Sequence, residues 1–269
     1  MKGWFILLGI WLTLVIAARC QGLPAAEPQE EEISTARPDN TDSPTVVPLR
    51  RVQLETGILL RRDQDGGVRQ TEFFYPRFLV RIGVLRNVEL RLEGDHRREE
   101  RKVLNAPGAP EQEQGLNAFT VGAKVRLVEG EGLRPGVGVV VNVALPYGGS
   151  AWVPLKLAPQ VVLAFSHDLT KSLQVQYNLG WERDWEGGEV QGQALYTLAL
   201  QQDLSDYIKV FGEVFGTKAA GEPMEHTLDG GLLFLLRRNL QLDIWGGVGL
   251  SSPASDYFIG TGLAIRLPR

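Results

Sequence analysis

The sequence is almost free of cysteine. Cys20 is the single cysteine among 269 residues, and it lies in the N-terminal leader. Without that leader the chain has no thiol, so it has no disulfide framework and no metal site built from cysteine sulfur. We therefore expect neither a metal nor another cofactor.

Excess positive charge is also missing. The formal net charge is −4, and no basic patch with interleaved aromatic residues occurs. This balance argues against a nucleic-acid partner. Apolar residues at three- and four-residue spacing are absent as well, so the sequence offers no amphipathic helix of the usual length.

The residues for nucleophilic catalysis are few. His96, His167 and His226 are the three histidines. His167 follows Ser166 and His226 precedes Thr227, and neighbours on a strand point to opposite faces, so neither pair converges. His96 lies in a charged stretch that is typical of a solvated loop. We therefore expect that the protein is not an enzyme, and a membrane lipid hydrolase is a less favoured alternative.

What is present begins with an export signal. Lys2 is followed by an apolar run of about 15 residues from 4 to 18, too short for a membrane helix and typical of a signal-peptide core. We assign 1–22 to a cleaved signal peptide. An uncleaved anchor is one alternative. Lipid attachment at Cys20 is another, although Arg19 stands where a lipoprotein signal has a small residue.

Residues 23–48 differ in composition from the rest. They have few large apolar side chains and an acidic run at 30–32. Their prolines are Pro24, Pro28, Pro38, Pro44 and Pro48. A segment that buries so little apolar surface does not offset its ordering entropy. We expect a disordered, acidic periplasmic spacer.

From residue 49 onward the apolar residues recur with a period of two. The stretch 171–181 shows the pattern most clearly. One parity carries Leu173, Val175, Tyr177, Leu179 and Trp181, and the other carries Ser172, Gln174, Gln176, Asn178 and Gly180. A strand of this kind has one apolar and one polar face. The apolar face meets a dry core in a soluble sheet and lipid in a membrane barrel.

About twelve segments share this pattern. They are 52–60, 74–82, 88–95, 119–127, 137–143, 155–166, 171–181, 193–201, 208–216, 227–236, 240–250 and 257–267. The connections alternate between short turns rich in Asp, Asn, Ser and Gly and longer loops. Behind an export signal, this alternation predicts an all-β protein, a closed antiparallel up-and-down transmembrane β-barrel over 49–269. A soluble secreted β-protein is the alternative.

Charged and amide side chains collect on the polar parity. The candidate lumen-lining residues are Arg77, Arg81, Glu89, Arg91, Glu93, Lys124, Arg126, Lys156, Gln174, Gln176, Asp229 and Asp243. An Arg or Lys on the lipid face at mid-depth would cost roughly 2–4 kcal/mol, so this parity should face the lumen. Phe211 and Phe215 break the pattern. The long loop 95–115 is our candidate for a constriction or an external binding element.

Two hairpins resemble a known family. The sequence Arg81-Ile82-Gly83-Val84-Leu85-Arg86-Asn87-Val88-Glu89-Leu90-Arg91 is similar to its early hairpin. The stretch 119–127, followed by 135–148 with its Leu145-Pro146-Tyr147-Gly148 ending, is similar to the next one. The family is that of "putative MetA-pathway of phenol degradation" proteins, and the resemblance covers about residues 50–269. It implies an outer-membrane barrel that passes small compounds, including hydrophobic ones, and it brings no catalytic residues.

These observations together favour a passive channel in the bacterial outer membrane. Its expected partners are outer-membrane lipid, including lipopolysaccharide, and a small solute, and we expect a monomer. A non-conducting barrel that displays loops at the cell surface is the alternative function. A water path through the barrel would favour the channel.

Overall fold

The structure is a computed structural model that describes residues 31–148, 152–184 and 191–267. A compact unit begins at Glu32. Its strands are β1 (Val52–Asp65), β2 (Val68–Leu85), β3 (Val88–Val103), β4 (Glu111–Leu116), β5 (Thr120–Val128), β6 (Gly136–Ala144), β7 (Ala158–Asp168), β8 (Leu173–Asp184), β9 (Gln191–Ser205), β10 (Ile208–Ala219), β11 (Glu225–Arg237), β12 (Leu240–Gly249) and β13 (Tyr257–Leu267). Within the described ranges, no helix is long and apolar enough to cross a membrane.

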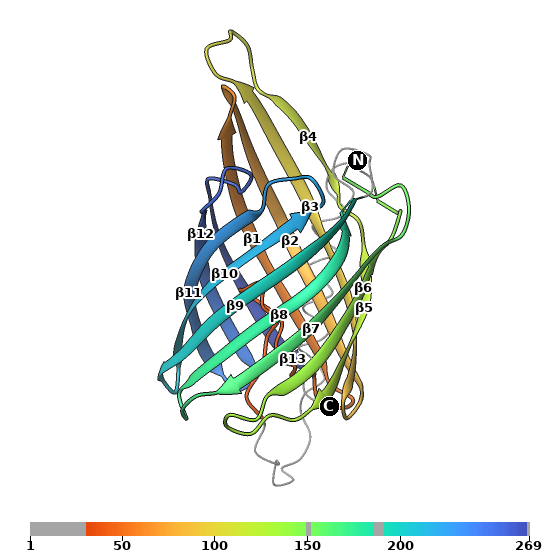
Figure 1. Cartoon of the computed structure of the whole chain (residues 1–269), viewed down its shortest axis with the longest axis vertical. Coiled ribbons are helices and arrows are strands. Elements are labelled where there is room, and N and C mark those ends of the chain that lie inside the picture. The colour runs from red at the N-terminus through yellow and green to blue at the C-terminus, as the bar shows by residue number, and fades with distance from the viewer. Residues whose placement is uncertain (1–30, 149–151, 185–190, 268–269) are drawn as a thin grey trace, which may run out of the picture. The chain divides into compact units, whose positions relative to one another are not determined.

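The strands form one antiparallel sheet that closes on itself (Figure 1). Apart from β4, each strand pairs with the strands before and after it around the ring, and β1 pairs with both β2 and β13. The short β4 pairs only with β3, along residues 96–101. Residues 88–93 of β3, nearer the barrel, pair with β5 instead. Twelve strands therefore make the closed ring, with β4 as an addition. Closure leaves no open edge, as backbone polar groups in a bilayer require.

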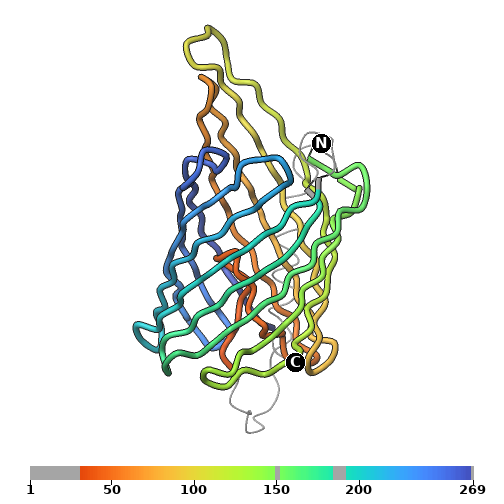
Figure 2. Tube along the Cα trace, in the orientation of Figure 1, coloured from red at the N-terminus to blue at the C-terminus, as the bar shows by residue number. Residues whose placement is uncertain are grey.

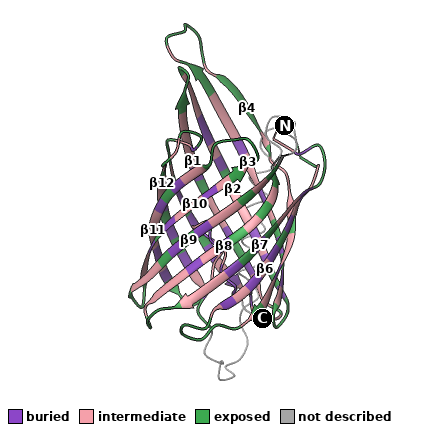
Figure 3. Cartoon of the chain, in the orientation of Figure 1, coloured by how far each residue is buried: buried purple, intermediate pink, exposed green. Residues whose placement is uncertain are grey.

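Burial alternates along the strands with polar side chains inside (Figure 3). In β1, Gln53 and Glu55 are 1% and 0% exposed, while Leu54 between them is 38% exposed. A soluble sheet would show the opposite arrangement. The prediction of a transmembrane barrel with an apolar exterior is therefore confirmed.

One part of the sheet reaches beyond the rest of the barrel. We call it the extension: residues 60–73 of β1 and β2 and 96–116 of β3 and β4 (Figure 1). Pairing continues to Asp65↔Val68 and Arg101↔Glu111. The prediction of a loop at 95–115 that constricts the lumen is wrong. Its charged residues alternate in sign along each face of β3, as in Arg97, Glu99 and Arg101, and they stand where other strands carry the apolar side chains that indicate a strand.

A chain segment lies inside the barrel. Residues 32–48, which we call the lumen segment, run within the strand wall (Figure 2). The Ile33 amide donates to the Arg238 carbonyl at 2.7 Å, and the Arg50 amide donates to the Gly83 carbonyl at 2.8 Å. Both contacts are at the rim with the short turns, so the segment enters and leaves there. In its described part, the expected spacer is thus ordered, which corrects our prediction of disorder.

Candidate functional site

Asp42, near the middle of the lumen segment, forms an ion-pair junction. Its Oδ1 lies 2.8 Å from Arg91 Nη1 and 2.7 Å from Lys124 Nζ. Lys124 Nζ also donates to the Ser43 carbonyl at 2.9 Å. Burial alone raises the pKa of Asp42, but the two cations outweigh it and hold the pKa below its ordinary value. Asp42 therefore stays charged and ties the segment to β3 and β5.

Arg81 of β2 forms a second junction. Its guanidinium lies 3.0 Å from Glu55 Oε1 and 2.8 Å from Glu89 Oε1. It also donates to the Ser34 carbonyl at 2.8 Å, while Glu89 Oε2 accepts from the Val47 amide at 2.7 Å. Buried charges are tolerated when their hydrogen bonds are completed in this way. The carboxylates of the wall thus bind the backbone of the lumen segment directly.

The opposite wall holds the segment through neutral and acidic groups. Asn178 of β8 accepts from the Asp42 amide at 2.7 Å and donates to the Asp42 carbonyl at 2.8 Å. Glu213 of β10 accepts from the Asn40 amide at 2.8 Å and from the Thr41 hydroxyl. The segment is therefore fastened on both sides of the lumen.

Three carboxyl groups meet beside this contact. Glu213 is the cross-strand partner of Asp229, and both oxygens of Asp229 are buried. Burial and these two carboxylates raise the pKa of Asp39 well above its ordinary value. Among the described residues, no cluster of His, Cys, Asp and Glu is arranged to hold a metal ion. Like charges this close are relieved when carboxyl groups hold protons.

An apolar cluster lines part of the lumen. Its members are Leu59, Phe74, Phe211, Leu233 and Trp245, with Phe258 packed against them. Arg37 of the lumen segment lies over the Trp245 ring at 4.8 Å, and its Nη2 is 3.9 Å from Asp243 Oδ1. The inward Phe211, which broke the alternation of the sequence, is thus part of an apolar surface inside a mostly polar lumen.

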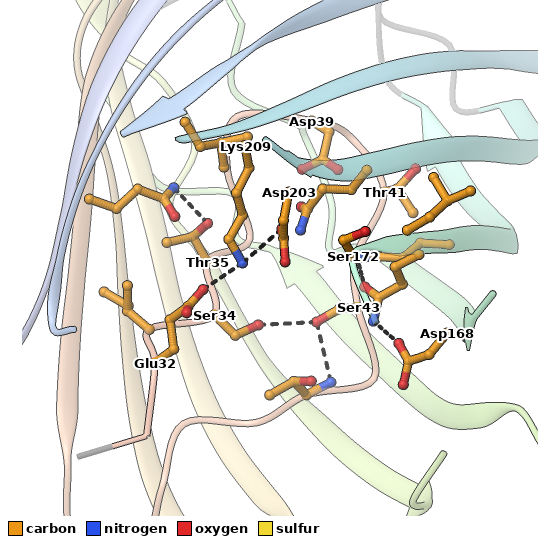
Figure 4. A pocket seen from close by; sticks show the side chains of 18 of the residues that line it. Glu32, Ser34, Thr35, Asp39, Thr41, Ser43, Asp168, Ser172, Asp203 and Lys209 are labelled. Atoms are coloured by element: carbon orange, nitrogen blue, oxygen red, sulfur yellow. Dashed lines mark hydrogen bonds and ion pairs between the residues drawn. The ribbon is translucent and has the colours of Figure 1, made fainter. Parts of the chain in front are cut away.

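A polar cavity of about 610 Å³ lies on the other side of the segment (Figure 4). It is bounded by the segment and by strands that include β8 and β10. Lys209 pairs with Glu32 and, at 3.4 Å, with Asp203, and Gln174 donates to Asp168 at 2.7 Å. The cavity opens between the short turns, so it forms a vestibule beneath the segment.

Close approach of the segment depends on glycines in the wall. A Cβ built on Gly83 would lie 2.2 Å from the Pro48 carbonyl oxygen, and one on Gly57 would lie 2.5 Å from both Arg37 Nη2 and the rigid Thr261 carbonyl oxygen of β13. Real Cβ atoms do not occur at such distances. These positions therefore admit only glycine while the segment remains where it is.

The predicted lumen-lining residues have different positions. Buried on the inner face are Arg81, Glu89, Arg91, Lys124, Gln176, Asp229 and Asp243. Half-buried are Arg77, Glu93, Gln174 and Arg126. Glu93 pairs with Arg91 at 3.3 Å, and Arg126 pairs with Glu129 at 3.5 Å near the short-turn rim. Lys156 is the exception, because it lies exposed in the loop before β7. Leu155 and Leu157 imitate strand alternation in that loop.

Several residues of the site did not enter our predictions. The strand alternation does indicate Gln53 and Glu55, because they share the polar parity of β1. Nothing in the sequence indicated Arg37 or Asp42, because their role depends on the barrel around them. The histidines also have different partners from those of a hydrolase. His167 contacts the Tyr177 hydroxyl at 3.3 Å, and His226 contacts the Tyr196 hydroxyl at 2.6 Å.

The fold and the polar lumen define a transmembrane β-barrel of the outer-membrane type, with an internal segment anchored by charges. Residues 35–267 match the family described as "Putative MetA-pathway of phenol degradation", and the chain belongs to this family. The matched range includes most of the lumen segment. No curated protein matches the sequence.

Two solved structures have a similar fold. The first is an outer-membrane channel from Pseudomonas putida F1, with a TM-score of 0.62, 10% identity, and coverage of 90% of this chain and 100% of that one. The second is the transport unit of the autotransporter AIDA-I from Escherichia coli, with a TM-score of 0.51, 10% identity, and coverage of 97% and 98%. At these identities the likeness shows the fold alone.

Proposed function

We propose that this protein is an outer-membrane channel for the passive passage of small apolar compounds. The apolar cluster inside the lumen is the observation that carries the proposal. A lumen that served only ions would not need buried aromatic side chains such as Phe211 and Trp245. The family's description, which concerns phenol degradation, supports the same solute class.

The charges of the lumen favour a small solute without charge. Arg81, Arg91 and Lys124 are each paired with carboxylates, so a polar solute finds their hydrogen bonds already taken. The lumen segment also occupies space at the level of these residues, which limits the size of a solute. A compound that needs no hydrogen bonds loses least by entering such a lumen.

A mainly apolar hollow of about 480 Å³ adjoins the cluster. Inward Leu59 and Phe74 line it together with outward Ile58 and Ile259, so the hollow lies within the wall. The pairing of β1 with β2 shifts register between Gly57 and Leu59, at the same height. Its volume falls in the range of small-molecule sites, which is about 300–1,000 Å³.

The alternative is a non-conducting surface protein. The occupied lumen and the extension favour it, because a filled barrel can serve to display a sheet. Uptake of an uncharged, labelled solute distinguishes the two functions, because passage of such a solute carries no current. The signal peptide over 1–22 lies outside the described residues, and both it and the monomeric state stay predictions.

Uptake into cells tests the channel directly. Cells that express the full-length protein should take up a labelled monoaromatic hydrocarbon at a several-fold higher initial rate than cells with an empty vector. A labelled disaccharide should show no such increase. Replacing Phe211 and Trp245 by serine should reduce the hydrocarbon rate at equal surface abundance. Equal hydrocarbon rates with and without the protein would contradict the proposal.

A further inference from the structure

The outer face of the extension carries a group of basic side chains. We call Arg62, Arg69, Arg98 and Lys102 the outer patch. Cross-strand pairing connects Gln64, Arg69 and Lys102 in one row of this face. Arg62 lies over the ring of Tyr257 at 5.8 Å, and Tyr257 is 38% exposed. The opposite parity is buried at Glu72 and Arg97. The patch therefore points away from the barrel axis.

The two faces of the extension differ in charge. By strand parity, the inner face carries Arg61, Arg97 and Arg101 with Asp63, Glu72, Glu99, Glu111 and Glu113. Its arginines are paired in part, since Arg97 contacts Glu72 and lies 2.9 Å from Glu99. The outer face sets the four basic residues of the patch against Glu100 alone. Gln112 and Gln114 complete that face on β4.

The outer patch is not neutralised within the protein. Glu100 pairs with Arg98. Arg69 lies directly across from Lys102, and like charges at such positions repel. Arg69 donates to the neutral Gln64 at 3.1 Å, and in the described ranges no carboxylate lies within ion-pair distance of Arg69 or Lys102. An external anion would remove this repulsion.

The height of the patch fits a membrane headgroup layer. Along the outward face of β3, Leu90 and Leu92 are followed by His96, whose ring packs at a tilt against Tyr75, with 5.2 Å between the ring centroids. Aromatic residues mark the boundary of the hydrocarbon layer. The next outward residues are Arg98, Glu100 and Lys102. At about 3.3 Å per residue, Arg98 lies about 7 Å and Lys102 about 20 Å beyond His96 along the strand.

We propose that the outer patch binds the phosphorylated glycolipid headgroups of the outer leaflet. Guanidinium groups bind phosphate oxygens in pairs, and basic side chains at a membrane surface attract anionic lipid. The proposal rests on the outer-membrane location given above, with the longer connections outside. It does not depend on solute passage, so a barrel that conducts nothing would still bind the lipid.

Binding of lipid A to the purified full-length protein in detergent tests the proposal. The probe is bisphosphorylated lipid A, compared with the same lipid after removal of both phosphates, and bound lipid per protein is counted by native mass spectrometry. The patch variant is Arg62→Gln/Arg69→Gln/Arg98→Gln/Lys102→Gln. The matched control is Arg86→Gln/Lys171→Gln/Arg237→Gln/Arg238→Gln, which removes the same charge from exposed positions at the other rim.

We expect the patch variant to bind bisphosphorylated lipid A at least about tenfold more weakly than the wild type, with the control variant unchanged. The dephosphorylated lipid should bind weakly to all three proteins. If the patch variant does not fold, Arg69→Gln/Lys102→Gln near the exposed tip should still weaken binding. Equal binding by wild type and patch variant, equal binding of both lipids, or full displacement by millimolar inorganic phosphate would overturn the proposal.

Discussion

Asp42 joins the lumen segment to the wall through two cations. Arg91 and Lys124 are buried and both lie within 2.8 Å of its Oδ1. Both cations are removed from water, so their burial carries a free-energy cost of desolvation. The carboxylate of Asp42 compensates that cost, so the segment and the basic wall depend on each other.

Asp42→Asn should therefore destabilise the barrel and loosen the segment. Removing one member of a buried ion pair costs roughly 3–5 kcal/mol, because the remaining charge is left without compensation. We expect a lower urea midpoint for unfolding in detergent. Asp206→Asn, at an exposed turn, is the control and should leave the midpoint unchanged. An unchanged midpoint in Asp42→Asn would show that the junction contributes nothing.

The carboxyl of Asp39 gives a pH dependence of the opposite sign to Asp42. The pKa of Asp39 is raised by burial and by Glu213 and Asp229. Its contribution to the stability of the lumen segment in the barrel is therefore complete at low pH and is lost as pH rises through the raised pKa. The pKa of Asp42 is lowered, so its contribution is lost only as pH falls toward that lowered value. The lumen segment should thus be held in the barrel most stably at mildly acidic pH.

Single-channel current as a function of pH measures this dependence. We expect open events to become more frequent as the solution is made alkaline. Asp39→Asn should reduce the increase, because it takes away one of the three carboxyl groups that meet at this site. Asp256→Asn, in the connection before β13, serves as the control. An increase of the same size in Asp39→Asn would refute a role for this carboxyl.

At the scale of elements, β2 and the end of the lumen segment fit closely. Gly83 lies against the Pro48 carbonyl, and its neighbour in the contact is backbone that has no flexible end to move. By contrast, a Cβ on Gly212 of β10 meets nothing within 4 Å. The two glycines therefore offer a direct comparison of a contact position and an open one.

Gly83→Ala should lower the free energy of unfolding by about 1–3 kcal/mol, as overpacking does in other interiors. Gly212→Ala should change it by less than about 0.5 kcal/mol. For the measurement, samples are heated to a series of temperatures and then run on an electrophoresis gel, and the temperature at which the folded band disappears is recorded. Equal temperatures for both variants would mean that the segment does not press on β2 as described.

At the scale of the whole molecule, the two-residue period determined how much of the fold was predictable. Strands such as β8 carry the pattern over most of their length, from Leu173 to Trp181, because one face meets lipid and the other meets the lumen. The lumen segment lacks any such period. Its order comes from polar partners on strands far away in the sequence, including Glu89 and Glu213, which no local pattern reveals. The strands of the extension were not predicted, because residues 97–102 of β3 carry charged side chains on both faces and no apolar ones.

The orientation of the whole barrel predicts where charge is tolerated. Leu198 is outward and 45% exposed near the middle of β9, and Leu204 is 60% exposed at the end of that strand. In lipid vesicles, Leu198→Arg should cost about 2–4 kcal/mol and Leu204→Arg about 0–1 kcal/mol. Reversible unfolding from vesicles measures both. Similar small costs at the two positions would contradict a lipid-facing exterior.

The central claim is that residues 32–48 occupy the lumen of a closed barrel. Single-channel conductance in planar bilayers tests it most directly, with the full-length protein and a variant in which 34–46 is replaced by a Gly/Ser sequence of equal length. Circular dichroism establishes that both retain the same strand content. We predict a conductance several times larger in the replaced variant. Equal conductance in the two proteins would contradict the account.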